Sequence, residues 1–208
     1  MNKDINRRNF IAGVLSAITI CVTRGANADS KDTAVQSLDS QIENLSSLNP
    51  DDLYKLQDNV QAHNSKLQHL LTDQLRSSGT QPEARLYAAF LLGVYRFPEA
   101  STALVENITL EDKHPHDTDA LWLWRKYPAM DALIRIGNAG LPDVIEEIAQ
   151  TDDATSLSLL VQVIKSVCRY PECSKAVISH AIDNETKPDR KARLQNALTN
   201  FDTLRVNN

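Results

Sequence analysis

The sequence predicts an all-α fold built from consecutive pairs of helices. Apolar residues recur every three or four positions over most of residues 29–208, which is the period of one face of a helix. Alternation with a period of two is rare there, and no Asn-Gly or Asp-Gly hairpin turn occurs. Prolines such as Pro98 and Pro171 follow the end of one amphipathic segment and open the next. Together these observations predict an α-α superhelix of helix pairs.

The first predicted element is an αα-hairpin within residues 29–80. A short helix is expected to begin near Ala34 and to carry an apolar face of Val35, Leu38, Ile42 and Leu45. The run Asn49-Pro50-Asp51-Asp52 is a favourable helix start, because asparagine caps a helix and proline fits its first turn. The second helix is expected to end near Gly79.

An internal repeat lies in the second half of the chain. Residues 94–101, VYRFPEAS, align with residues 167–174, VCRYPECS, and the two copies share Val, Arg, Pro, Glu and Ser. A third, weaker copy consists of Ile136-Gly137 followed by Leu141-Pro142-Asp143. In each copy an acidic residue follows the proline, where it complements the positive end of the helix dipole. The repeat predicts three helix–turn–helix corners.

Two segments, 86–93 and 127–137, carry small alanines, an aliphatic stripe and a terminal glycine. In these features they resemble the first helices of HEAT-type repeats. The resemblance extends over about Pro82 to Phe201 and implies a solenoid domain at 81–208 that binds proteins through an extended surface. The array is expected to close with helices at 154–168, 172–182 and 188–201, the last of them a polar cap.

The first 28 residues have the composition of an export signal. A basic start is followed by a short apolar run at 10–22, and Ala26-Asn27-Ala28 forms a cleavage site of the A-x-A type. We therefore expect cleavage after Ala28 and a periplasmic or secreted mature chain. The alternative is that the segment is retained as an N-terminal anchor.

Within this signal, Arg7, Arg8 and Phe10 resemble the motif of the twin-arginine family, whose members are exported already folded. Asn6 and Ala12 depart from the residues usual in that family, so the general secretory route remains the alternative.

Removal of the signal would change the net charge from −5 to −8, because four basic residues and one acidic residue are lost. Such acidity without a basic cluster argues against nucleic acid and against an anionic membrane surface as partners. The apolar run at 10–22 is shorter than the roughly 20 residues that span a bilayer, and no later run is longer. No membrane span is expected in the mature chain.

The mature chain would keep two cysteines, Cys168 and Cys173. An even number of cysteines in an oxidising compartment favours a disulfide, and Pro171 places the two on opposite sides of a turn. The alternative is two small buried residues without a bond, since the equivalent positions of the first copy hold Tyr95 and Ala100.

A histidine-rich segment, His114-Pro115-His116-Asp117, is the arrangement closest to a metal site. The competing interpretation is a polar linker in which Asp117 or Thr118 caps a helix at 119–126. The linker is favoured, because Pro115 imposes a turn and no further ligand stands nearby.

In that helix Trp122 and Trp124 would point to nearly opposite faces. Trp122 is therefore a candidate partner contact, because tryptophan is a frequent interface anchor. The alternative is that both rings pack inside the array.

No motif of a serine hydrolase, a P-loop, a zinc protease or a dinucleotide-binding protein is present. We therefore expect a non-catalytic, exported helical-repeat protein that needs no cofactor and binds an unidentified protein partner or acts as a scaffold. The alternative is a small metal-dependent or redox enzyme of the cell envelope, using His114, His116 and Asp117 or the cysteine pair.

Overall fold

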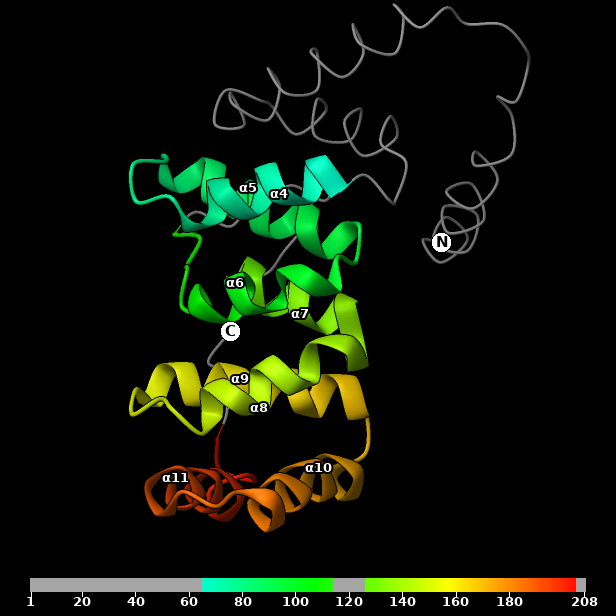
Figure 1. The fold of residues 1–208 in the computed structure, drawn as a ribbon, viewed down its shortest axis with the longest axis vertical. Helices are drawn as coiled ribbons and strands as arrows, with labels where there is room; N and C mark the ends of the chain where they lie inside the picture. Colours follow the sequence, from blue (N-terminus) through cyan, green and yellow to red (C-terminus); the bar gives the residue numbers. More distant parts are fainter. Residues whose placement is uncertain (1–64, 114–125, 205–208) are drawn as a thin grey trace, which may run out of the picture. The chain divides into compact units, whose positions relative to one another are not determined.

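The computed structural model describes residues 65–113 and 126–204, and this part of the chain contains helices and no β-strand. The predicted all-α class is confirmed for it. The helices are α4 (Ser65–Arg76), α5 (Pro82–Val94), α6 (Ser101–Glu106), α7 (Pro128–Ile136), α8 (Leu141–Ile148), α9 (Ala154–Cys168), α10 (Pro171–Asn184) and α11 (Pro188–Thr199), with the 3-10 turns η3 (Pro98–Ala100) and η4 (Gly137–Gly140) (Figure 1). None of these helices has both the length and the apolar character needed to cross a bilayer.

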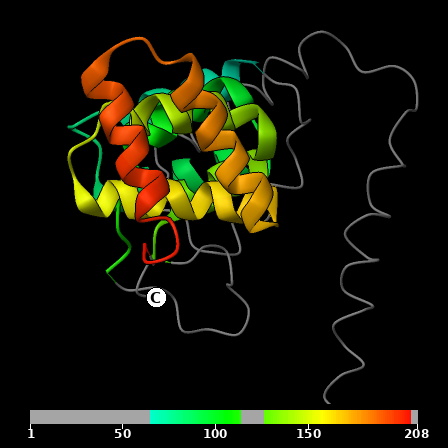
Figure 2. The same cartoon turned by 90° about the horizontal axis from the view of Figure 1, so that it is seen from below.

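The helices pack in two layers (Figure 1). In one layer α4 contacts α6 and α6 contacts α8, while in the other α5 contacts α7, α7 contacts α9 and α9 contacts α10. Across the layers α4 packs on α5, α6 on α7, α8 on α9 and α10 on α11. Figure 2 shows the last pair, α10 and α11, side by side. The predicted pairing of consecutive helices is therefore present, whereas a HEAT-like superhelix stays a prediction.

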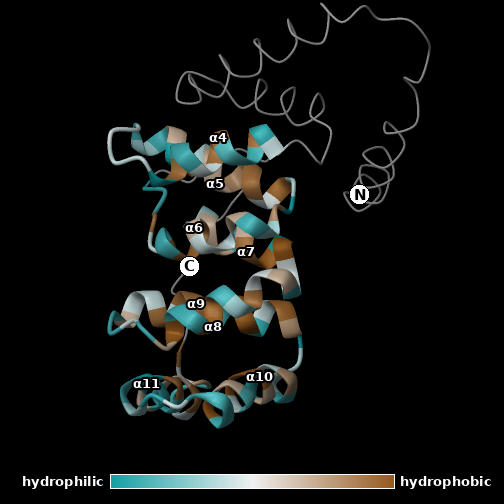
Figure 3. Ribbon diagram, in the orientation of Figure 1, coloured by the Kyte–Doolittle hydropathy of each residue, from teal (hydrophilic) through white to brown (hydrophobic). Residues whose placement is uncertain are grey.

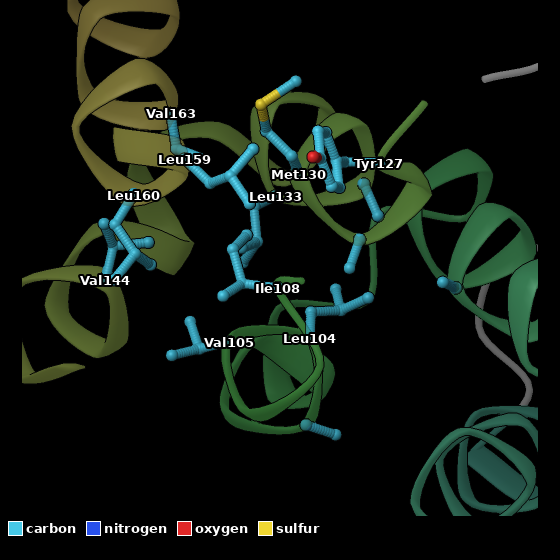
Figure 4. Packing of buried hydrophobic residues seen from close by; sticks show 14 of the residues in the cluster. Leu104, Val105, Ile108, Tyr127, Met130, Leu133, Val144, Leu159, Leu160 and Val163 are labelled. Atoms are coloured by element: carbon cyan, nitrogen blue, oxygen red, sulfur yellow. The ribbon is translucent and has the colours of Figure 1, made fainter. Parts of the chain in front are cut away.

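The core lies between the two layers and is mainly aliphatic. Leu133 of α7 is fully buried there, and Figure 4 shows it together with Leu159 of α9, Ile108 and Leu104. Figure 3 shows the hydrophobic residues concentrated on α5, α7 and α9, whereas α11 is largely hydrophilic and buries Leu194 and Ala197. The polar character expected of the last helix agrees with this distribution.

The crossing of α5 and α7 is a close helix contact. A Cβ atom added to Gly93 would lie 2.5 Å from the Cα atom of Ala132 and 2.7 Å from its Cβ atom. Ala89 of α5 and Ala129 of α7 are also fully buried. The small alanines and the glycine of these two segments therefore let the two backbones approach each other.

Several helix starts have the predicted chemistry. The carboxylate of Asp153 accepts a hydrogen bond from Ser156 N at 2.6 Å, which caps α9 at its N-terminus. Proline stands in the first turn of α5, α7, α10 and α11, where its missing N–H leaves no hydrogen bond unmade.

Arginine–carboxylate pairs join parts of the fold that are not consecutive in the chain. Arg76 of α4 donates to Glu106 of α6 at 2.8 Å. Arg193 of α11 pairs with Asp152 at 2.6 Å. Arg190 of α11 makes a bidentate pair with Glu146 of α8, with both N···O distances 2.7 Å, and a third bond of 2.7 Å to Glu185.

Replacing Arg190 with alanine is expected to lower the thermal midpoint by a few degrees near neutral pH. Hydrogen bonding to Arg190 lowers the pKa of Glu146, and bonds from Lys187 N and then Arg190 lower the pKa of Glu185. Because both pKa values are lowered on folding, this stabilisation is complete above the ordinary carboxylate pKa of about 4.3 and is lost as the pH falls through the folded values.

Thermal unfolding of wild type and variant, followed by circular dichroism near neutrality and in acid, measures this difference. The gap between the two proteins should shrink in acid. The matched control is Arg193→Ala, whose pair is more exposed (32% and 79%, against 20% and 14% for Arg190 and Glu185) and should matter less. Equal effects at both arginines, or a gap that does not change with pH, would contradict the expectation.

Candidate binding site at the α9–α10 corner

Several predicted site residues lie outside the described ranges, so the corresponding hypotheses stay predictions. They are the export-signal residues Arg7, Arg8 and Phe10, the cleavage residues Ala26 and Ala28, the histidine segment with His114, His116 and Asp117, and the two tryptophans, Trp122 and Trp124. The backbone N–H of Asp112 donates to the carbonyl of Lys126 at 2.8 Å, so the described residues on either side of segment 114–125 are joined. Over residues 65–113 and 126–204, no group of three or more His, Cys, Asp or Glu side chains is placed to hold a metal ion.

The three predicted corners share a backbone feature. Each first helix is followed by a residue with positive φ: Arg96 (53°), Gly137 (76°) and Arg169 (64°). In the third, weaker copy the turn η4 is inserted before α8 begins. Glycine adopts positive φ freely, whereas arginine in this region is strained. Two of the three corners therefore keep an arginine where glycine would fit with less strain.

The serine that ends the repeat motif is buried in two corners, but its hydroxyl bonds to acceptors that are not equivalent. Ser101 and Ser174 are both buried. The hydroxyl of Ser101 donates to Pro98 O at 2.7 Å, and that of Ser174 donates to Tyr170 O at 3.1 Å. The two copies therefore share the buried serine, whereas its hydrogen bonding differs, because Ser101 also bonds to the carboxylate of Asp143.

The two corners differ in the aromatic residue before the proline. Phe97 is buried, at 5% exposed, and its ring lies 5.7 Å from the ring of Tyr95. Tyr170 is 70% exposed, and it is the one exposed large apolar side chain in the described residues. Cys168 occupies the position of Tyr95 in the second copy, so no ring packs against Tyr170 there.

A pocket of about 440 Å³ is lined in part by Arg169 and Pro171, the chain neighbours of Tyr170, although Tyr170 itself does not line it. Its lining residues come from α9, the start of α10 and the segment after α11: Gln162, Lys165, Arg169, Pro171, Ser174, Phe201 and Asp202. Pockets for small ligands and peptide side chains have volumes in this range, about 300–1,000 Å³. We call Tyr170 together with these lining residues the corner site.

Cationic groups converge on the corner site. The ammonium of Lys165 lies 4.6 Å from the centre of the Phe201 ring and donates to Leu204 O at 2.8 Å. The ammonium of Lys175 lies 5.4 Å from the same ring and pairs with Asp202 at 2.8 Å. The guanidinium of Arg169 has neither a hydrogen bond nor an ion pair with any other residue that the structure describes. Arg169 is therefore the charge at this site that is open to a ligand.

The predicted cysteine pair flanks the same corner. Both thiols are free, and the side chain of Cys168 is hydrogen-bonded to that of Cys173. The predicted disulfide stays a prediction, with its two partners adjacent. Burial, followed by the hydrogen bond with Cys173, raises the pKa of the Cys168 thiol. A raised pKa keeps the thiol protonated at neutral pH, which is opposite to the shift that activates a redox cysteine.

A second, smaller hollow of about 250 Å³ lies between the end of α8 and α11. Its polar lining includes Arg193 and Asp152, which pair with each other. Because these charges are mutually satisfied, this hollow offers less to a ligand than the corner site.

The chain matches no protein-family model, no curated protein and no solved structure. The class that the fold and the site define is therefore that of an all-α protein made of helix pairs, with one open, cationic corner. The sequence repeat marks this corner, but it does not point to Arg169, Tyr170 or Lys165 as site residues. The available signal was the change from Tyr95 to Cys168, which removes the ring that packs on the aromatic residue.

Proposed function

We propose that this chain is an exported, non-catalytic helical-repeat protein that binds a protein partner through the corner site. In this proposal the helix pairs form a HEAT-like superhelix, and the twin-arginine signal delivers the folded chain to the periplasm. The observation that carries the proposal is the 70% exposure of Tyr170 in a corner whose sequence repeat buries the equivalent ring.

Exposed tyrosine is a typical interface anchor, because its ring contributes apolar area and its hydroxyl a hydrogen bond. The pocket lined by its chain neighbours offers a recess for one side chain of the partner, and Arg169 offers a charged contact. A neighbouring ring, a recess and a free guanidinium are the features that peptide-binding surfaces combine. The raised pKa of Cys168 gives the alternative of a redox enzyme no support.

Photo-cross-linking tests the proposal directly. The full chain, with Tyr170 replaced by p-benzoylphenylalanine, is produced in bacterial cells, irradiated and purified, and its adducts are identified by mass spectrometry. We expect one discrete protein adduct. The matched control places the same group at Thr102, which is exposed on α6 and equivalent to Lys175 in the repeat. Absence of an adduct at position 170, or the same adducts at both positions, would refute the corner site as a protein-binding surface.

A further inference from the structure

We infer that the partner segment is an acidic peptide, one of whose carboxylates pairs with Arg169 while a neighbouring side chain packs on Tyr170. This inference rests on the proposed function and specifies the chemistry of the partner. Its basis is the charge of the corner site, which is opposite in sign to that of the chain as a whole.

The whole chain has a net charge of −5, yet the lining of the corner site carries two cations, Lys165 and Arg169, and one carboxylate, Asp202, which is paired with Lys175. The carboxylate of Asp202 forms an ion pair with the ammonium of Lys175 at 2.8 Å. Arg169 is thus the group that gains most from an external anion, and a guanidinium binds a carboxylate through two parallel hydrogen bonds. A basic partner would instead face the cations of Lys165 and Arg169.

The backbone at Arg169 allows a substitution that removes the guanidinium without disturbing the turn. Its φ of 64° is strained for arginine and ordinary for glycine. A turn that needed only this conformation would be stabilised by glycine. Arg169→Gly therefore removes the guanidinium without harming the fold, which separates binding from stability.

Arg96 provides a matched control. It has the same place in the repeat and a φ of 53°, but its corner buries the neighbouring ring of Phe97. Arg96→Gly should relieve the same backbone strain and leave binding at the corner site unchanged.

Asp202 provides a test of the sign of the charge on the bound peptide. It lines the pocket and would lie close to the carboxylate of an acidic peptide. Asp202→Asn removes this like charge and also frees Lys175, so an acidic peptide should bind more tightly to this variant. A basic peptide would bind more weakly, and a neutral apolar peptide would bind with little change.

The experiment selects short random peptides, displayed on phage, against the immobilised full chain. Selected peptides are then synthesised, and their affinities for wild type and variants are measured by fluorescence anisotropy at low and high salt. We expect sequences enriched in Asp and Glu, binding about tenfold more weakly to Arg169→Gly, the loss of roughly one charge-assisted hydrogen bond. We also expect tighter binding to Asp202→Asn, weaker binding in high salt, and no change with Arg96→Gly.

The thermal midpoint of Arg169→Gly distinguishes a binding role of the arginine from a structural role. We expect it to equal or exceed that of wild type. If Arg169→Gly lowered both the midpoint and the affinity, the arginine would be structural and the inference would be overturned.

The remaining outcomes separate this inference from the proposed function. Peptides that lose affinity with Tyr170→Ala but not with Arg169→Gly would overturn the acidic partner and leave the corner site standing as a protein-binding surface. Peptides whose affinity depends on neither residue would overturn both.

Discussion

Replacing Gly93 with alanine is expected to reduce the free energy of unfolding by about 2 kcal/mol, because overpacking at a fixed crossing outweighs the gain in helix propensity. Alanine is favoured over glycine inside a helix by about 0.5–1 kcal/mol. Against this, the added Cβ would lie 2.5 Å from the Cα atom of Ala132. A backbone atom cannot rotate away as a side chain does, so α5 and α7 would have to separate.

Urea denaturation followed by circular dichroism measures this loss. Gly79→Ala is the control, because the nearest atom to an added Cβ there is Ser77 Oγ, 3.9 Å away, and this variant should unfold like wild type. Adding Ala132→Gly to Gly93→Ala removes the contact at 2.7 Å but not the one at 2.5 Å, so it should restore little stability. A Gly93→Ala variant as stable as wild type would show that the two helices do not cross this closely.

The local order of the chain could be predicted from the sequence, because helix ends depend on neighbouring residues. The segment 154–168 was predicted as a helix and is α9, with Asp153 as its cap. Prolines such as Pro171 and Pro188 were expected to open helices and do so. These signals act within one or two turns, so they do not require knowledge of the packing.

The corner site could not be predicted in the same way, because the exposure of Tyr170 depends on whether a side chain from elsewhere packs over its ring. Phe97 and Tyr170 stand in nearly identical sequences, and their exposure differs because Tyr95 packs near the first and Cys168 stands beside the second. Phe201 is separated from Lys165 by 36 positions, yet it lies against the ammonium group of that lysine. Such contacts between distant segments arise from the pairing of helices, which the motif itself does not encode.

Arg190 is a further residue whose contact with a distant helix could not be predicted from the sequence. The sequence placed it on a polar end helix, and the fold turns it toward Glu146 of α8. The polar face of α11 is therefore also a contact face, which couples the last helix to the pair before it.

Replacing Leu133 with alanine is expected to destabilise the protein by about 3 kcal/mol, within the range measured for fully buried leucines. Leu133 is fully buried in α7, which packs against α5, α6 and α9. Removal of its side chain would leave a cavity where the helices before and after α7 meet. Because each pair in an array contacts only its neighbours, a central defect should lower the protection of both ends.

The same substitution at Leu194 of α11 is the matched control for position. Leu194 is also buried, but α11 contacts α10 and α8 and has no helix of the described residues beyond it. Amide hydrogen exchange of each helix distinguishes the two variants. We expect Leu194→Ala to lower protection mainly in α10 and α11, and Leu133→Ala to lower it from α4 to α10. If Leu194→Ala lowered the protection of α4 and α5 as strongly as that of α10, the helices would unfold as one cooperative unit, and the array behaviour implied by a HEAT-like superhelix would be wrong.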